Sequence, residues 1–284
     1  MTAALLTLLL AAPGEKTHWS EAHGVGVALP GTWTIVAKDD GDRAFVVDGP
    51  QLGPGIPRAV LWYAGPAAAR TLDDKAEQLR AQVSKREGWA ITATVRKTVG
   101  PFPCVRMALT FREPGKAKGR ARFTVALLGG NYYVLELSAA ASHFPAKTFD
   151  RIEQSLQVKW QQETWECGIT LEAPPGWKLA EGGGGGAIEG PRRGRQPTLI
   201  LLSKEREMGP APETARPGPK LRFHRELRET MIDERAIQDE EQRMLVLNAE
   251  GWTVVVRMPV DAWEDLFPVA EEIVRRAKLA AEDG

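Results

Sequence analysis

Four basic side chains alternate along one short stretch of the chain and form its most concentrated charge pattern. They are Lys116, Lys118, Arg120 and Arg122. Alternate residues of a β-strand point to the same face, so this spacing predicts a row of positive charges on one side of a hairpin. Such a row could bind an anionic partner or a membrane surface. The more common alternative is a solvated sheet edge whose charges prevent edge-to-edge aggregation.

The residue types that support catalysis or metal binding are not arranged for it. The four histidines, His18, His23, His143 and His224, show no metal-ligand spacing with one another or with a cysteine. The sequence also contains no Gly-x-Ser-x-Gly motif and no Cys near a patterned His. We therefore predict no catalytic residue, no metal site and no cofactor, and a function by binding. An enzyme is kept as an alternative, because a fold does not determine a function.

Two further patterns resemble binding motifs but lack the residues those motifs require. The glycines Gly182 to Gly186 are not followed by the Lys-Ser/Thr pair of a phosphate loop, and they predict a flexible hairpin tip. The acidic residues between Asp233 and Glu241 include no glycine for a calcium loop, and they predict a solvated helix end and strand edge. Cys104 and Cys167 could form a disulfide, but we favour two separate thiols.

One local pattern occurs twice and predicts the architecture. Residues 25–33 read VGVALPGTW, and residues 169–177 read ITLEAPPGW. In each, a short alternating strand ends at a proline turn, and the chain resumes at Trp33 or Trp177. An internal repeat on this scale predicts tandem domains.

In the first copy, the pattern predicts strands, a helix, further strands and a closing helix. The first helix begins after the N-cap Thr71 and ends at Gly88, and the closing helix begins near Pro145. The strands are expected at residues 25–29, 33–36, 43–47, 59–63, 89–98, 105–112, 120–128 and 132–138.

The second copy keeps the order but is shorter. Strands are expected at 169–173, 198–202, 243–247 and 252–257, with no counterpart of the 105–128 hairpin. A helix is expected around Leu221 to Ile232, and a last helix from Asp261, with Glu264 completing a capping box. Trp160 and Trp165 flank the linker, and we hypothesise that they pin the two domains together.

Taken together, these elements resemble the PsbP/Mog1/DcrB-like (DUF1795-type) superfamily. The resemblance depends on the strand that ends in Pro-x-x-Trp and on the closing helix FDRIEQSL at 149–156. It implies an α+β protein with two tandem α/β/α sandwich domains, 23–158 and 166–280, each an antiparallel sheet flanked by helices. It also implies mostly non-enzymatic roles: extrinsic photosystem subunits, a Ran-binding protein, bacterial envelope lipoproteins and chaperones for type VI secretion effectors. The family has no shared catalytic residues to transfer.

The N-terminus and the overall charge suggest a location and a class of partner. Residues 1–14 form a short apolar run with a small-residue exit, typical of a cleaved signal peptide, although no Lys or Arg precedes the run. No cysteine stands at the end of this run, and no later apolar stretch is long enough to span a membrane. A formal net charge of zero argues against nucleic acid. We expect a periplasmic or secreted envelope protein that binds a protein or peptide. The alternative is a cytoplasmic chaperone for secreted effectors.

Overall fold

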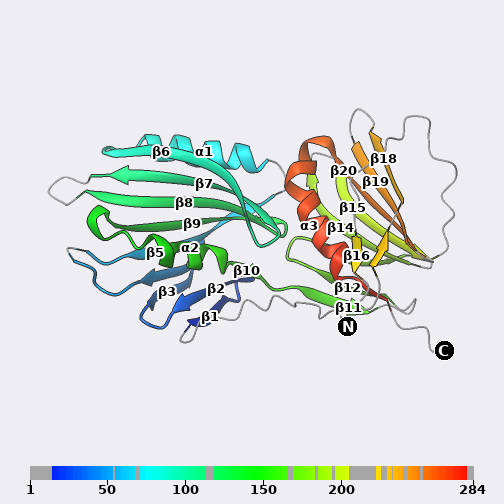
Figure 1. Ribbon diagram of the computed structural model, residues 1–284, viewed down its shortest axis with the longest axis horizontal. Helices are drawn as coiled ribbons and strands as arrows, with labels where there is room; N and C mark the ends of the chain where they lie inside the picture. Colours follow the sequence, from blue (N-terminus) through cyan, green and yellow to red (C-terminus); the bar gives the residue numbers. More distant parts are fainter. Residues whose placement is uncertain are drawn as a thin grey trace.

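A computed structural model of the chain shows two sheet-rich units that follow each other along the sequence (Figure 1). The residues that the structure describes are 15–53, 55–67, 71–112, 118–164, 169–182, 185–193, 196–204, 222–224, 229–231, 233–238, 242–249 and 252–279. The predicted signal peptide lies outside these ranges, as do Lys116, Trp165 and Cys167.

The first unit is built on a seven-stranded antiparallel sheet with the strand order β3-β4-β5-β9-β8-β7-β6. Each of these strands overlaps a stretch that the sequence predicts to be a strand. The strands are β3 (Thr34–Asp40), β4 (Arg43–Asp48), β5 (Arg58–Pro66), β6 (Trp89–Val99), β7 (Phe102–Phe111), β8 (Gly119–Leu128) and β9 (Asn131–Ala140).

Helices lie on both faces of this sheet. Arg80 of α1 (Leu72–Ser84) donates to Thr94 on β6, whereas Glu153 of α2 (Ala146–Gln154) contacts Arg106, which is paired with Val95. Neighbouring strand residues point to opposite faces, so α1 and α2 cover opposite sides. A small sheet is joined to α2 and comprises β1 (Glu15–Ser20), β2 (Val25–Pro30) and β10 (Gln157–Val158). A short 3₁₀ turn, η1 (Ala141–His143), precedes α2.

The second unit has the same strand succession wherever the structure describes it. Its larger sheet runs β13-β14-β15-β20-β19-β18, which matches the order β3-β4-β5-β9-β8-β7 position by position. Its strands are β13 (Lys178–Gly182), β14 (Gly185–Arg193), β15 (Gln196–Lys204), β18 (Asp233–Gln238), β19 (Gln242–Ala249) and β20 (Trp252–Pro259). A small sheet and one helix complete it: β11 (Gln161–Thr164), β12 (Ile169–Ala173), β21 (Lys278–Leu279) and α3 (Trp263–Arg276), which follows the 3₁₀ turn η2 (Val260–Ala262).

The middle of the second unit differs from the prediction. Where the sequence predicts a helix, the described residues form β16 (Arg222–His224) and β17 (Glu229–Met231). The acidic stretch beginning at Asp233 is strand β18, which pairs with β19 in the hairpin that we expected to be missing. The sequence of β18, DERAIQ, favours a helix locally, but pairing with β19 overrides that weak preference.

The two tryptophan corners have the same geometry. The amide of Trp33 donates to the carbonyl three residues earlier at 2.9 Å, and that of Trp177 does the same at 3.1 Å. Each indole lies over a glycine: a Cβ on Gly49, which directly follows β4, would lie 2.8 Å from the Trp33 ring, and one on Gly190, within β14, would lie 2.6 Å from the Trp177 ring. The glycines are therefore required because the rings occupy the space of a side chain.

The two units share one contiguous cluster of buried apolar side chains and meet through backbone contacts. At the turn between β8 and β9, the amide of Gly130 donates to the carbonyl of Pro175 at 2.7 Å, and Gly130 lies directly against Gly176. The carboxylate of Asp265 on α3 accepts from the amide of Leu72 at 2.8 Å and from Arg96 at 2.7 Å. The α3 helix thus lies between the two large sheets (Figure 1).

Candidate functional site on the basic strands of the first sheet

The predicted row of four bases divides into parts with different surroundings. Lys116 lies outside the described residues. Lys118 is exposed just before β8, and Arg120 is exposed on β8 itself. Arg122 is on the same face of β8, but only 12% of its side chain is exposed, and it forms an ion pair with Asp150 at 2.7 Å. Arg122 therefore belongs to a polar network rather than to a solvated row.

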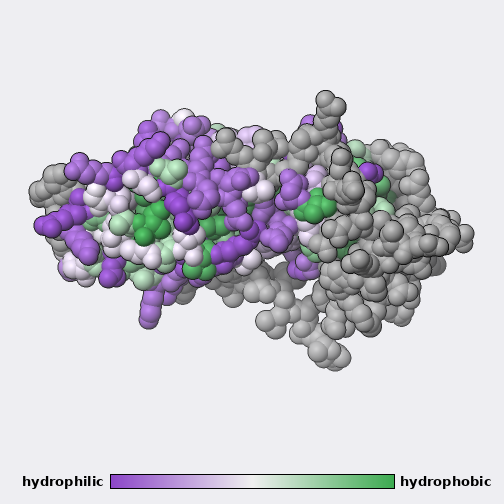
Figure 2. All heavy atoms as spheres, turned by 90° about the horizontal axis from the view of Figure 1, so that it is seen from above, coloured by the Kyte–Doolittle hydropathy of each residue, from purple (hydrophilic) through white to green (hydrophobic). Residues whose placement is uncertain are grey.

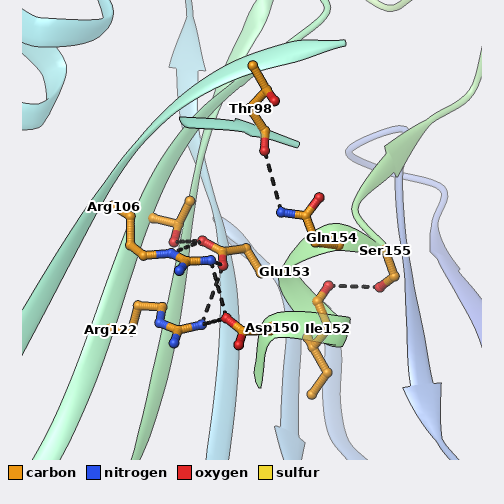
Figure 3. A network of polar contacts seen from close by, with 9 residues as sticks. Thr98, Arg106, Arg122, Asp150, Ile152, Glu153, Gln154 and Ser155 are labelled. Atoms are coloured by element: carbon orange, nitrogen blue, oxygen red, sulfur yellow. Dashed lines mark hydrogen bonds and ion pairs between the residues drawn. The ribbon is translucent and has the colours of Figure 1, made fainter. Parts of the chain in front are cut away.

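That network joins α2 to the sheet through a buried carboxylate (Figure 3). The side chain of Glu153 is 1% exposed and contacts both Arg106 on β7 and the hydroxyl of Thr124 on β8. Arg106 also lies 3.4 Å from Asp150. Two guanidinium groups thus face two carboxylates, and the network is electrically balanced.

A buried carboxylate is stable only when it is paired and hydrogen bonded, and Glu153 satisfies both conditions. The network therefore fixes α2 on the sheet and leaves neither carboxylate available as a general acid or base. The sequence does contain a signal for this network. Glu153 lies four residues after Phe149, so it falls on the same apolar face of the helix as Phe149 and Ile152. A charged residue on the buried side of a helix predicts a charged partner on the surface below it.

The three outer strands of the sheet carry positive charge and no acidic residue. The sequences of β6, β7 and β8 contain five Arg and Lys side chains and no Asp or Glu: Arg96, Lys97, Arg106, Arg120 and Arg122. Carboxylates from other elements neutralise three of them; Arg96, for example, contacts Asp73 at 2.9 Å. In the part of the chain that the structure describes, Lys97, Lys118 and Arg120 have no ion-pair partner. A net positive surface remains on this side of the sheet.

Strand β6 forms the outer edge of the sheet, and it is unusually open. Every residue from Thr92 to Thr98 is exposed, on both faces, and 47% of Val95 is exposed. After a bulge between Ile91 and Ala93, the pairing with β7 is regular from Ala93 to Val99. An edge strand presents unpaired N–H and C=O groups along its outer side, and natural sheets usually cover or shorten such edges. This one is long, and no other described strand pairs with its outer side.

Glu136 marks a second, smaller feature on the α1 side of the sheet. On β9 it is paired with Val60 of β5 on one side and with Phe123 of β8 on the other, and Val46 of β4 is the next residue in this cross-strand row. Burial raises the pKa of the Glu136 carboxyl, and the charges of Arg86 and Arg58 oppose that effect. A half-buried carboxyl in an apolar row is a weak candidate for ligand contact.

The remaining titratable groups do not combine into a reactive centre. No cluster of three or more potential metal ligands occurs among the described residues. His23 stacks on Tyr63 at 5.4 Å and lies 3.0 Å from the Gly41 carbonyl, which is a structural setting. Cys104 is a free thiol, and burial raises its pKa to about 11, so it is not a reactive thiolate.

Figure 2 shows the molecule from above. On this face, the surface of the described residues is mostly hydrophilic and is interrupted by small apolar patches. No described helix combines the length and the hydrophobicity needed to cross a bilayer.

Comparison with known proteins finds similarity at the level of solved structures. No family model and no curated protein matches it. Among solved structures, a protein of Bacteroides thetaiotaomicron aligns with a TM-score of 0.39 at 13% identity over 56% of this chain. The alignment spans about half of that protein, 53% of its length.

Two further structures align with about half of this chain and nearly all of their own. LpqN, involved in cell envelope biogenesis of Mycobacterium tuberculosis, aligns with a TM-score of 0.40 at 12% identity, and the alignment covers 51% of this chain and 90% of LpqN. Cyanobacterial PsbP (CyanoP) from Synechocystis has a TM-score of 0.39 at 10% identity and covers 53% and 95%. A PsbP protein is thus among the structures similar to part of the chain.

Proposed function

We propose that the protein is a non-catalytic binding or accessory protein of the bacterial cell envelope that holds a protein or peptide partner on its first unit. The observation that carries the proposal is the outer third of the first sheet. There, β6 to β8 combine an exposed edge and an acid-free sequence with Lys97 and Arg120, which, like Lys118 just before β8, have no ion-pair partner in the described residues. Such a surface suits recognition of a polypeptide.

We further propose that the chain consists of two copies of one PsbP/Mog1/DcrB-like unit, with boundaries near 23–158 and 166–280. The matching strand orders and the equivalent Trp33 and Trp177 corners favour this arrangement. Within the described residues, the larger sheet of the second copy has no strand in the position of β6. The two copies would then have different tasks, with partner binding assigned to the first.

The envelope location depends on residues 1–14 acting as a signal peptide. Mass spectrometry of the native protein tests this directly, because cleavage after Ala12 or Gly14 removes the apolar run. A mature chain that retains Met1 or Thr2 would contradict the envelope location and favour the cytoplasmic chaperone.

Partner binding is tested by photo-crosslinking in the native host. A photoreactive residue is placed at Thr94 on β6, at Arg120 on β8 or at Val36 on the opposite edge strand, with Lys178 of the second unit as the control; all four positions are exposed. We expect an adduct with a second polypeptide at one or more of the first-unit positions and none at Lys178. Equal labelling at all four positions, or no adduct anywhere, would overturn the proposed function.

A further inference from the structure

We propose that an extended acidic segment of the partner adds to the first sheet as an eighth strand, paired with β6. The inference rests on the proposed function and specifies how the partner is held. It follows from three separate properties of β6: its backbone geometry, the exposure of its side chains and the charge around it.

The backbone geometry selects an extended occupant. From Ala93 to Val99, β6 pairs with β7 without interruption, so its outer side presents a regular set of backbone donors and acceptors. The carbonyl of Thr98 already accepts from the side chain of Gln154, which leaves the stretch from Ala93 to Lys97 for a partner. Only another extended backbone can satisfy such a set along its whole length. A helix laid on the edge would leave these groups unpaired.

The exposure of the side chains shows that space for such a strand exists. Thr92 to Thr98 are exposed on both faces of the sheet. Among the described residues, α1 reaches β6 from one face, and α2 reaches only its end, where the side chain of Gln154 donates to the carbonyl of Thr98 at 3.4 Å (Figure 3). Within the part of the chain that the structure describes, no strand occupies the outer side of β6.

The charge selects an acidic sequence. On the α2 side of the sheet, the occupant would lie next to Lys97 and Val95, with Arg106 one strand further in. On the α1 side it would lie next to Thr94 and Arg96. Arg96 and Arg106 already contact carboxylates of this chain, so the charge that selects the occupant is that of Lys97, which has no ion-pair partner among the described residues. A glutamate or aspartate beside Lys97 supplies that partner, whereas a basic segment would be repelled.

The same charge argues against a second copy of this chain as the occupant. Pairing of β6 with β6 of another copy would bring together two strands that each contain Arg96 and Lys97 and no acidic residue. Arg96 is paired with Asp73 and Asp265 in its own chain, but such a pairing leaves Lys97 of each copy without a carboxylate. Self-association is therefore an outcome that would count against the proposal.

Designed peptides test the inference on the purified full chain. The probe is an acetylated and amidated decapeptide in which glutamate alternates with threonine or valine. One control peptide has lysine in place of every glutamate, and another is N-methylated at successive amides so that both of its edges are blocked. Binding is measured by fluorescence anisotropy, and hydrogen-exchange mass spectrometry locates the protected amides.

We expect the acidic probe to bind and to protect segments that contain residues 92–98, and both control peptides to bind at least about fivefold more weakly. Lys97→Glu should weaken binding of the acidic probe about threefold to fivefold. The matched control is Lys178→Glu, because Lys178 is an exposed lysine on a strand of the second unit, and this variant should leave binding of the probe unchanged. Circular dichroism confirms that both variants are folded.

Four results would overturn the inference: no saturable binding of the acidic probe, equal binding of the N-methylated peptide, protection elsewhere on the molecule, or protection of β6 that depends only on the protein's own concentration. These results are distinguishable from failure of the proposed function. Crosslinks to a partner at Arg120 or Val36 without any peptide effect at β6 would preserve partner binding and reject the added strand.

Discussion

Glu153 shows how one residue can determine the position of a whole element. Its carboxylate is buried, and it neutralises Arg106 while lying 3.4 Å from Arg122, whose side chain is itself only 12% exposed. Because these three groups share one network, removal of one charge leaves the others only partly compensated in a poorly solvated place. The effect of a substitution here should therefore greatly exceed that of an exposed ion pair.

The first prediction concerns this carboxylate. Glu153→Gln keeps the shape of the side chain and removes its charge, and we expect a loss of about 3 kcal/mol in the free energy of unfolding. The matched control is Asp150→Asn, because Asp150 contacts the same arginines but is 51% exposed; its loss should be below about 1 kcal/mol. Urea denaturation at neutral pH measures both, and equal losses would contradict the assignment of Glu153 as the buried partner.

The second prediction concerns the pH dependence that Glu136 introduces. Burial raises its pKa above the ordinary value of 4.5, so the native state holds the proton more tightly than the unfolded chain does. The stability that it contributes is therefore complete at low pH and is lost as the pH rises through the raised pKa. Glu136→Gln cannot ionise and should not show this loss.

We expect Glu136→Gln and the wild type to have similar unfolding free energies near about pH 4, and the variant to be the more stable of the two near about pH 7.5. Thermal or urea unfolding at a series of pH values checks the sign. A difference that grows as the pH falls would mean that Glu136 is stabilised in its charged form by Arg86 or Arg58.

At the scale of elements, α1 and α3 begin in different ways. The hydroxyl of Thr71 accepts from the amide of Asp74 at 3.1 Å, and the carboxylate of Asp74 accepts from the amide of Thr71 at 3.0 Å, so α1 begins with the capping box typical of its sequence. The box predicted from Asp261 to Glu264 does not form. There, a 3₁₀ turn precedes α3, whose N-cap is Ala262.

This contrast gives the third prediction. Thr71→Ala removes a cap hydrogen bond and should cost about 1 kcal/mol. Asp261→Ala should cost less than about 0.5 kcal/mol, because no side-chain cap is lost at α3. Differential scanning calorimetry of the two variants is sufficient. A larger loss for Asp261→Ala would show that the first turn of α3 is capped in solution.

The sequence predicts elements well where the apolar alternation is strong and poorly where pairing decides. All seven strands of the first large sheet were predicted, because stretches such as those of β5 and β9 are rich in bulky apolar and aromatic residues and are bounded by turn residues. Strand β18 was missed, because its local preference is helical and its partner β19 determines its structure.

The candidate site was predicted only in part, for a similar reason. The alternation of Arg120 and Arg122 correctly places both on one face of β8, but sequence spacing contains no information about which cross-strand or helical carboxylate neutralises each base. The openness of β6 was also not predictable, because exposure of an edge depends on where α1, α2 and the second unit pack.

At the scale of the whole molecule, the contact between the two units is too close to be a flexible hinge. The backbones of Gly130 and Gly176 are in direct contact. In the linker, the ring centroid of Trp160 lies 6.4 Å from that of Phe102 in the first unit and 4.0 Å from the guanidinium carbon of Arg276 in the second. The hypothesis that Trp160 pins the units therefore has a specific geometry, although its proposed companion Trp165 lies outside the described residues. Units joined in this way should unfold together.

The last prediction tests that coupling at Gly130. A Cβ at this position would lie 2.8 Å from the Cα of Gly176, and a backbone atom cannot move aside as a side chain can. We expect Gly130→Ala to lower the free energy of unfolding by about 2 kcal/mol. Gly55→Ala is the control, because the nearest atom to its new Cβ is 3.8 Å away, and it should change stability by less than about 0.5 kcal/mol.

Since the units share one core, hydrogen exchange in β8 and in β15 should accelerate by the same factor in Gly130→Ala. Acceleration confined to one sheet would show that the two units unfold independently and would contradict the coupling through Gly130 and Gly176.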